Sequence, residues 1–560
     1  MKKRYGLAII ALLSAATLTL GGCSSTNQHE ASSDSAGGVH INLKGDYNPM
    51  ERNQIKDGGE LTLPIYEISE QSNSLHANSV LDTLTLWRWY NPQPVLFDGD
   101  GTWHPNPAYL TNVNAEEVDG KTVVTYDINP DAVFNDDTPI DWRAFETTWK
   151  VSSGENKDFS VSSTDGYELI ESVTAGESDK QAVVTFKQPF AWWQALFNQI
   201  MHPSVSDPQI FNEGYLKNPH PEWGSGPFKV DTFDYNGGTV TFVPNEKWWG
   251  EKPKLDKVTY RQMESQAIIN AFQAGEIDAA SVAAKDNLAV AKQMKDINIL
   301  GALQPSNFLL TLNSKTPALE DIKVRQALFT GVDRETLAQI RFNGLDYKED
   351  LPGSIVLFQN QEGYQDNFSS VVQYDQDKAK QLLDEAGWAE GGDGIREKDG
   401  EKLKLRYVTF GDDQMTKSSV AGLQKMMKDI GVDMQVEERP TSDFSRVLAE
   451  KDFDFIMSGF GSTDPFGMLY FKQDYASDSE LNKSGTGTPE FDEKINELYQ
   501  ISDQTEQIAK ANELEKEAFA QYGIMPYANG PQLTGVKKGL ANFGAYAFAV
   551  VPKENIGWAK

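Results

Sequence analysis

The sequence predicts an α/β protein with two or more lobes, and three observations support this prediction. The chain has 560 residues, which is too long for one ordinary hydrophobic core. Strand-like and helix-like segments are mixed along its length, with no repeat of fixed period. Between residues 403 and 460 they follow the order strand, helix, strand, helix, strand, which is typical of a parallel sheet with crossover helices.

This segment shows the clearest periodicities in the chain. Residues 403–407 and 432–436 alternate between apolar and other side chains, as strands do. Residues 420–430 place their apolar side chains on one helical face, and residues 441–450 can form a second helix. Residues 453–457 are expected to form the last strand of the unit.

The loop after that strand is the best candidate for a binding site. It reads Gly459-Phe460-Gly461-Ser462-Thr463-Asp464. In open parallel sheets, ligands bind beyond the carboxyl ends of the strands. We therefore expect these residues to face a ligand.

Other elements are expected on both sides of this unit. Strands are predicted by β-branched or alternating residues at Glu60–Ile65, Val123–Ile128, Ala182–Phe186, Thr239–Val243 and Val258–Arg261, the last two as a possible pair. Helices are predicted at Ser265–Gln273, Asp321–Leu328 and Gln376–Glu385.

The composition excludes several classes of protein. Lys and Arg total 51 and Asp and Glu total 82, giving a net charge of −31, which argues against a nucleic-acid binder. Hydrophobic content of 39% and aromatic content of 11% fit a folded protein. The single cysteine, Cys23, excludes disulfides within the chain and zinc sites made of several cysteines.

The N-terminus is typical of a targeting segment. Lys2, Lys3 and Arg4 precede an apolar stretch, residues 7–20, that is shorter than the roughly 20 residues of a membrane-spanning helix. The stretch ends in Leu20-Gly21-Gly22-Cys23, which resembles the lipobox of bacterial lipoproteins. We expect a signal peptide over residues 1–22 and lipid attachment at Cys23, so that the protein is anchored on the extracytoplasmic face of the cell membrane. The alternative is an ordinary secretory signal with an incidental cysteine.

Residues 23–59 are expected to form a flexible tether, because they are rich in Ser, Asn, Gly and Asp and contain few large apolar side chains.

Catalytic and cofactor motifs are missing from the sequence. There is no phosphate-binding loop ending in Lys-Ser or Lys-Thr and no Gly-x-Ser-x-Gly motif. The six histidines show no spacing suited to metal ligation. The acidic pair Asp136-Asp137 precedes Thr-Pro and is typical of a turn rather than a glycosidase site. We expect no enzyme, no metal and no cofactor.

Several segments together resemble the large solute-binding proteins of peptide and nickel ABC importers, extracellular solute-binding protein family 5. They span about residues 60–560 in the family's order. The segments are Tyr126–Phe145, Gly224–Phe228, Pro244–Gly250, Pro253–Asp256, Val324–Leu328, Val332–Glu335, Ala379–Trp388, Asn482–Asp492, Ile524–Tyr527 and Glu554–Trp558.

The resemblance implies a two-lobed, periplasmic-binding-protein-like fold of type II, cluster C, with an extra subdomain in the first lobe. Lobe I is expected over residues 60–304, with the subdomain inserted at about 97–218, and lobe II over 305–528. Residues 529–560 are expected to return to lobe I.

The resemblance also implies the function. Such a protein captures an oligopeptide between two closing lobes and delivers it to the permease of an ABC importer in the membrane. Its partners would be the peptide and the permease subunits, without nucleic acid, and it would be a monomer. The alternatives are an oligosaccharide, a metal chelate or haem in the same fold, and, from another class, a secreted hydrolase.

The resemblance suggests specific ligand contacts. Peptide-binding members often hold the peptide α-amino group with an Asp after a Gly-Trp or Gly-Phe pair. Here Asp464 follows Gly459-Phe460 one residue later than the commonest spacing, at which Thr463 stands. The alternative for Asp464 is a turn-forming or helix-capping residue before Pro465.

Two further groups are candidates for ligand contact. Backbone groups of Gly459, Gly461 and Ser462 can pair with a peptide main chain as an added strand does. The aromatic residues Trp89 and Tyr90 are candidates for the cleft wall, with core packing as the alternative.

Overall fold

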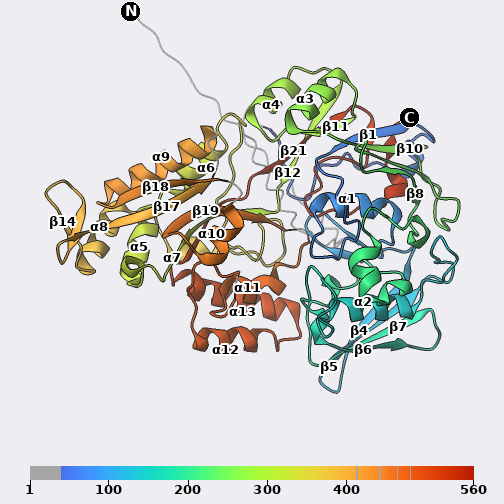
Figure 1. Cartoon of the computed structure of the whole chain (residues 1–560), viewed down its shortest axis with the longest axis horizontal. Coiled ribbons are helices and arrows are strands. Elements are labelled where there is room, and N and C mark those ends of the chain that lie inside the picture. Colours follow the sequence, from blue (N-terminus) through green and yellow to red (C-terminus); the bar gives the residue numbers. More distant parts are fainter. Residues whose placement is uncertain (1–38, 411–413, 441–442, 463, 480) are drawn as a thin grey trace, which may run out of the picture. The chain divides into compact units, whose positions relative to one another are not determined.

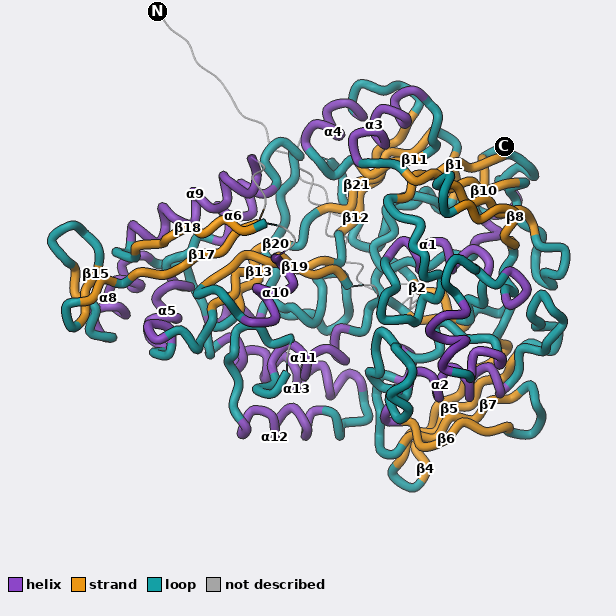
Figure 2. Tube along the Cα trace, viewed as in Figure 1, coloured by secondary structure: helices purple, strands orange, loops and turns teal. Residues whose placement is uncertain are grey.

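The computed structural model describes residues 39–410, 414–440, 443–462, 464–479 and 481–560, and these residues form one compact unit. Helices and strands are mixed throughout this unit (Figures 1 and 2). The predicted signal peptide and the predicted lipidation site Cys23 lie outside the described residues.

A five-stranded sheet contains the predicted β-α-β-α-β unit. Its order is β18-β17-β19-β13-β20. The strands are β13 (Ser306–Leu312), β17 (Lys404–Phe410), β18 (Asp433–Arg439), β19 (Phe455–Gly461) and β20 (Ile524–Ala528). Strand β17 runs parallel to β18 and β19, which confirms the predicted parallel arrangement. Strand β13 runs antiparallel to both of its neighbours, β19 and β20, and completes the sheet together with β20.

Helices cover both sides of this sheet (Figure 1). The crossover helices are α9 (Gln414–Asp429) and α10 (Phe444–Glu450), as predicted. Helix α6 (Arg334–Arg341) packs on α9, and α5 (Ile322–Thr330) packs on α8 (Gln376–Glu385). A large hydrophobic core lies between these helices and the sheet, with Leu405, Leu423 and Phe455 at most 1% exposed.

Two smaller sheets lie outside this five-stranded sheet. The order β1-β10-β9-β8 joins Glu60–Ile65, Lys257–Gln262, Thr239–Pro244 and Phe228–Asp234. The predicted pairing of residues 239–243 with 258–261 is confirmed as an antiparallel pair. The order β11-β21-β12 joins Ala279–Ser281, Pro531–Lys537 and Ile297–Leu303, beside helices α3 (Ser265–Ala274) and α4 (Lys285–Ala291).

A four-stranded antiparallel sheet is inserted in the sequence between β1 and β8. Its order β4-β5-β7-β6 joins Leu110–Val118, Lys121–Ile128, Gln181–Phe186 and Ile170–Ala175. Helix α2 (Trp142–Ser152) packs against this sheet and begins at the N-cap Asp141, whose side chain accepts the Arg143 N–H at 2.9 Å.

The remaining elements are shorter or lie at the periphery. The helices are α1 (Leu81–Tyr90), α7 (Asn367–Val371), α11 (Phe471–Tyr475), α12 (Pro489–Leu498) and α13 (Gln504–Phe519). The short strands are β2 (Val95–Phe97), β3 (Trp103–Pro105), β14 (Ala389–Glu390), β15 (Arg396–Lys398), β16 (Glu401–Lys402), β22 (Leu540–Ala541) and β23 (Gly557–Trp558).

The inserted sheet and helices α11–α13 share one hydrophobic core. Hydrogen bonds also join the inserted region to helices α11 and α13. Gln504 Nε2 donates to the Ala191 carbonyl at 2.6 Å, and Gln473 Nε2 donates to Asp165 Oδ2 at 2.7 Å. These contacts hold the inserted region against the part of the chain that contains β19.

Residues 39–59 correct the expected length of the tether. Ile55 is fully buried and bridges to Ala559, and Asp46 bridges to Ala545. The Asn48 side chain donates to the Leu540 carbonyl at 2.6 Å. This segment is therefore attached to the C-terminal part of the chain, mainly through backbone hydrogen bonds, which leave little trace in the hydrophobic pattern.

Two chain segments connect the five-stranded sheet with the β11-β21-β12 sheet. They are residues 303–306, between β12 and β13, and residues 528–531, between β20 and β21, and we call them the crossover segments. The Gln304 N–H donates to the Gly530 carbonyl at 3.0 Å, and Asn529 Nδ2 donates to the Ser306 carbonyl at 2.7 Å. Because they run side by side, we expect the two segments to bend together when the lobes close.

Glu349 fixes the second crossover segment. Its carboxylate accepts the backbone N–H groups of Asn529 at 2.7 Å and Gly530 at 2.8 Å. Replacing Glu349 with Gln leaves only one acceptor oxygen, so we expect a loss of about 2 kcal/mol in unfolding free energy and faster hydrogen exchange at both amides. Asp350→Asn, at the exposed neighbouring position, is the matched control. Unchanged exchange at residues 529 and 530 in Glu349→Gln would contradict the prediction.

Candidate functional site

The carboxyl end of β19 has an unpaired edge. On one side, Phe308, Asn307 and Ser306 of β13 pair with Gly459, Phe460 and Gly461. On the other side, β17 pairs with β19 at residues 455 and 456, and no described strand pairs with residues 457–461. The backbone groups on this edge are therefore open to an added strand.

The structure corrects one boundary at this site. Gly459, Phe460 and Gly461 belong to β19, although the sequence placed them in the loop after it. A Cβ at Gly459 would lie 2.7 Å from the Asn307 carbonyl oxygen, so close approach to β13 requires a glycine there. Gly459 and Gly461 are both exposed, which suits contact with a ligand main chain.

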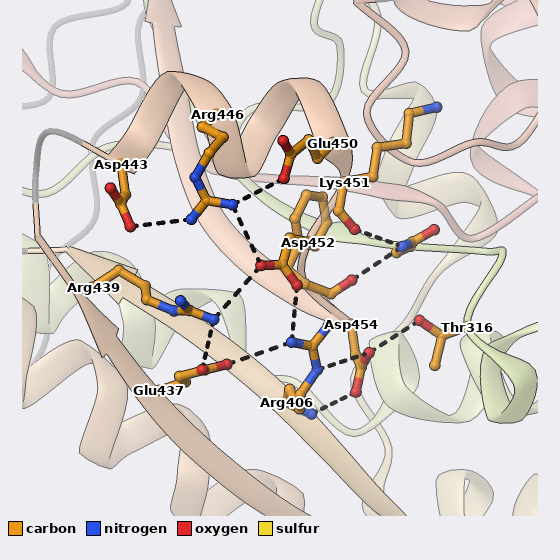
Figure 3. A network of polar contacts seen from close by, with 12 residues as sticks. Thr316, Arg406, Glu437, Arg439, Asp443, Arg446, Glu450, Lys451, Asp452 and Asp454 are labelled. Atoms are coloured by element: carbon orange, nitrogen blue, oxygen red, sulfur yellow. Dashed lines mark hydrogen bonds and ion pairs between the residues drawn. The ribbon is translucent and has the colours of Figure 1, made fainter.

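A network of charged side chains positions the start of β19 (Figure 3). Arg406 on β17 donates its backbone N–H to Asp454 at 2.6 Å and its guanidinium to Asp452 at 3.0 Å. Arg439 on β18 and Arg446 on α10 lie 3.6 Å and 3.9 Å from Asp452 Oδ2. Each partly exposed pair contributes little stability alone, but together they fix β17, β18, α10 and β19 relative to one another.

Asp464 lies just beyond β19, and its carboxylate makes two hydrogen bonds within the protein. Oδ1 accepts the Phe466 N–H and Oδ2 accepts the Tyr470 hydroxyl, both at 2.9 Å. Burial raises the pKa of Asp464, and the nearby Arg88 cation opposes that effect. The turn-forming alternative is therefore visible in the structure. A carboxylate has further lone pairs, so it can also accept from a ligand ammonium group.

The other residues of the loop are placed differently. The Ser462 N–H donates to the Pro305 carbonyl at 2.8 Å. This amide is therefore already paired with the residue that precedes β13, and the expected pairing of the Ser462 backbone with a peptide stays a prediction. Thr463 lies outside the described residues, as does the side chain of Phe460.

Trp89 and Tyr90 lie in the core, each 1% exposed. Trp89 packs edge-on against Phe228, with 5.2 Å between the ring centroids, and its Nε1 donates to the Tyr260 hydroxyl at 2.9 Å. The Tyr90 hydroxyl donates to the Pro219 carbonyl at 3.0 Å. This placement agrees with the packing alternative, so neither side chain is included in the contacts proposed below.

A cavity of about 210 Å³ lies beside Asp464. Arg88 of α1 and Tyr470 are also in its wall. The sequence prediction missed both residues. Arg88 had a recognisable signal, because it is a cation inside the aromatic run Trp87-Arg88-Trp89-Tyr90 on a helix whose other residues are largely apolar.

Neither a metal cluster nor a spanning helix is found in the part of the chain that the structure describes. No group of three or more His, Cys, Asp or Glu side chains there could hold a metal ion. No helix among the same residues has the length and apolar composition needed to cross a membrane.

Known proteins with similar sequences are solute-binding proteins. The model of the bacterial extracellular solute-binding proteins, family 5 middle region, matches residues 103–481. The oligopeptide-binding protein OppA of Mycobacterium tuberculosis is 33% identical over 97% of this chain and 92% of its own length. The nickel-binding periplasmic protein of Escherichia coli is 25% identical over 74% of this chain and 79% of its own.

Solved structures show the same architecture. The periplasmic EDTA-binding protein EppA superposes with a TM-score of 0.81 at 25% identity, covering 92% of this chain and 98% of its own. The oligopeptide-binding protein AppA of Bacillus subtilis, in complex with a nonapeptide, gives a TM-score of 0.69 at 21% identity, covering 90% and 100%.

The fold and the open strand edge define the class of this protein. It is a two-lobed α/β solute-binding protein with a periplasmic-binding-protein-like fold of type II. The chain belongs to the bacterial extracellular solute-binding proteins of family 5.

Proposed function

We propose that this protein is lipid-anchored through Cys23 on the extracytoplasmic face of the membrane, captures oligopeptides and delivers them to an ABC importer. The unpaired edge of β19, which ends beside Asp464, is the observation that carries the peptide assignment. A peptide main chain pairs with such an edge whatever its side chains are, and a carboxylate at the end of the strand can pair with the α-amino group.

The two lobes divide the ligand contacts between them. The β19 edge and Asp464 lie on the lobe we assign to residues 305–528, and α1 lies on the lobe we assign to residues 60–304. Contacts from both lobes exist together only when the lobes close, so peptide binding stabilises the closed form. The closed form is then the one that the permease recognises.

Incubation of the purified protein with a defined peptide mixture tests this function. Native mass spectrometry is expected to show complexes with intact peptides at a ratio of one to one. Cleaved peptides would indicate a hydrolase instead. The absence of any complex would reject the peptide assignment.

A metal chelate is the second candidate ligand, because the similar protein EppA is named for binding EDTA. The same mass measurement, repeated with a metal–EDTA complex, separates the two candidates. If the protein retains the chelate and binds none of the peptides, the metal chelate is the favoured ligand.

The lipid anchor is tested on the native protein. Intact mass spectrometry of protein extracted from membranes is expected to show a chain that begins at Cys23 and carries acyl groups, since stable anchoring needs more than one lipid chain. A chain that begins elsewhere without acyl groups would reject the anchor and leave the peptide assignment standing.

A further inference from the structure

The cavity beside Asp464 is enclosed by three parts of the chain. Its wall includes Arg88 from α1, Ser152 and Asn198 from the inserted region, and Asp464 and Tyr470 from the segment after β19. Its volume of about 210 Å³ is far above that needed for a single water molecule. It therefore has room for a ligand side chain.

Three residues in the wall of this cavity each contain one polar atom with no hydrogen-bond partner among the described residues. These atoms are Arg88 Nε, Ser152 Oγ and Asn198 Oδ1, and all three are buried. Folded proteins pair the great majority of their buried polar atoms. Three unpaired atoms around one cavity therefore indicate a polar occupant. Arg88 Nε can only donate, Ser152 Oγ can donate or accept, and Asn198 Oδ1 can only accept, so the occupant must accept a hydrogen bond at Arg88 and donate one at Asn198.

The wall of the cavity carries charges of both signs. Arg88 forms no ion pair with any described residue, and burial lowers its pKa to about 10, so it stays charged at neutral pH. Burial and then the Arg88 cation lower the pKa of Lys553 to about 7. Asp464 provides the opposite charge, because Asp165, the other carboxylate of the cavity, is already held by Ser163 and Gln473.

We propose that this cavity binds a ligand carboxylate at Arg88, next to the site at which Asp464 holds the α-amino group. The protein therefore prefers peptides whose first residue is acidic. This inference rests on the proposed peptide function and adds a substrate preference to it. The same carboxylate chemistry could come from the C-terminus of a dipeptide, and the experiment separates these two sources.

Calorimetric titration of the purified protein with matched peptides tests the preference. Glu-Ala-Ala-Ala is expected to bind at least tenfold more tightly than Gln-Ala-Ala-Ala, which has nearly the same shape without the charge. In Arg88→Met the two affinities should agree within twofold. Arg143→Met, which removes an exposed arginine outside the cavity, should keep the tenfold ratio, and Arg88→Lys should keep part of it.

A dipeptide pair identifies the source of the carboxylate. If amidation of Ala-Ala weakens binding tenfold in the wild type and has no effect in Arg88→Met, the C-terminal carboxylate occupies the site. If Arg88→Met changes neither the ratio of the affinities for Glu-Ala-Ala-Ala and Gln-Ala-Ala-Ala nor the loss of affinity caused by amidation of Ala-Ala, the proposal is overturned.

The ligand-free protein gives an independent measurement. An unpaired buried cation destabilises a fold, so ligand-free Arg88→Met should melt at the same temperature as the wild type or higher. A lower melting temperature would show that Arg88 has a structural partner and would overturn the proposal. Failure of the proposed peptide function gives a different result, because no peptide would then bind the wild type. The melting temperatures would still show whether Arg88 has a structural partner.

Discussion

Replacing Asp464 with Asn is expected to weaken the binding of peptides with a free α-amino group about 100-fold. The side chain keeps its shape, but the ion pair with the ligand ammonium is lost in a buried place, and truncating such a pair typically costs about 3 kcal/mol. An N-acetylated peptide has no charged amine and should bind the two proteins equally. Isothermal titration with both peptides measures the difference, and equal losses for both would contradict the role of Asp464.

Asp165→Asn is the matched control for this variant. Asp165 lines the same cavity, but its carboxylate is held by Ser163 at 2.6 Å and Gln473 at 2.7 Å. It is not proposed to contact the ammonium group, so the change should alter affinity less than threefold.

The affinity should also depend on pH through Asp464. Burial raises the pKa of this carboxyl, so it becomes neutral at a higher pH than an exposed aspartate. As pH falls through that raised pKa, the charge that holds the ammonium is lost and affinity falls. Asp464→Asn should remove this part of the pH profile.

Replacing Arg334 with Met is expected to lower the free energy of unfolding by about 3 kcal/mol. Arg334 is 8% exposed, and its Nη1 donates to the carbonyls of Pro352 and Pro526, both at 2.8 Å. Nη2 donates to Ser369 Oγ at 2.9 Å, and the guanidinium lies 4.4 Å from the centre of the Phe368 ring. Methionine fills the space but leaves the carbonyls unpaired, and each such loss costs about 1–3 kcal/mol.

Urea unfolding measures this effect, with Glu335→Gln as the control. Glu335 is the next residue along α6 but lies at the surface, paired with Lys348 at 2.8 Å, so its replacement should change stability by less than about 1 kcal/mol. Equal stability of Arg334→Met and the wild type would show that the hydrogen bonds of Arg334 contribute nothing net.

The sequence predicted the β17–β19 unit well because local patterns determine it. Alternation at residues 403–407 and the helical stripe at 420–430 each predict one element without reference to distant residues. The end of β19 was missed for the opposite reason. Two glycines argue against a strand, but pairing with β13, about 150 residues earlier, decides the outcome.

The candidate site was predicted only in part, for a similar reason. A motif spacing drew attention to Asp464, but its contacts with Phe466 and Tyr470 depend on how the next turn folds. Arg88 lies more than 370 residues before Asp464 in the sequence, and only the folded chain brings both into one cavity. Trp89 and Tyr90 attracted attention as aromatics, while the polar residue beside them was the one that reached the cavity.

The position of β21 has a consequence for how the chain matures. This strand, Pro531–Lys537, lies between β11 and β12, which precede it by more than 200 residues, and the last residues of the chain then pair with residues 46–56. During synthesis, β11 and β12 therefore cannot form their sheet until β21, near the C-terminus, has been synthesised. The five-stranded sheet, drawn from residues 306–528, can assemble earlier. Loss of roughly the final 30 residues would therefore remove β21, the central strand of the β11-β21-β12 sheet. The C-terminal segment is thus needed for the part of the molecule that is synthesised first to complete its fold.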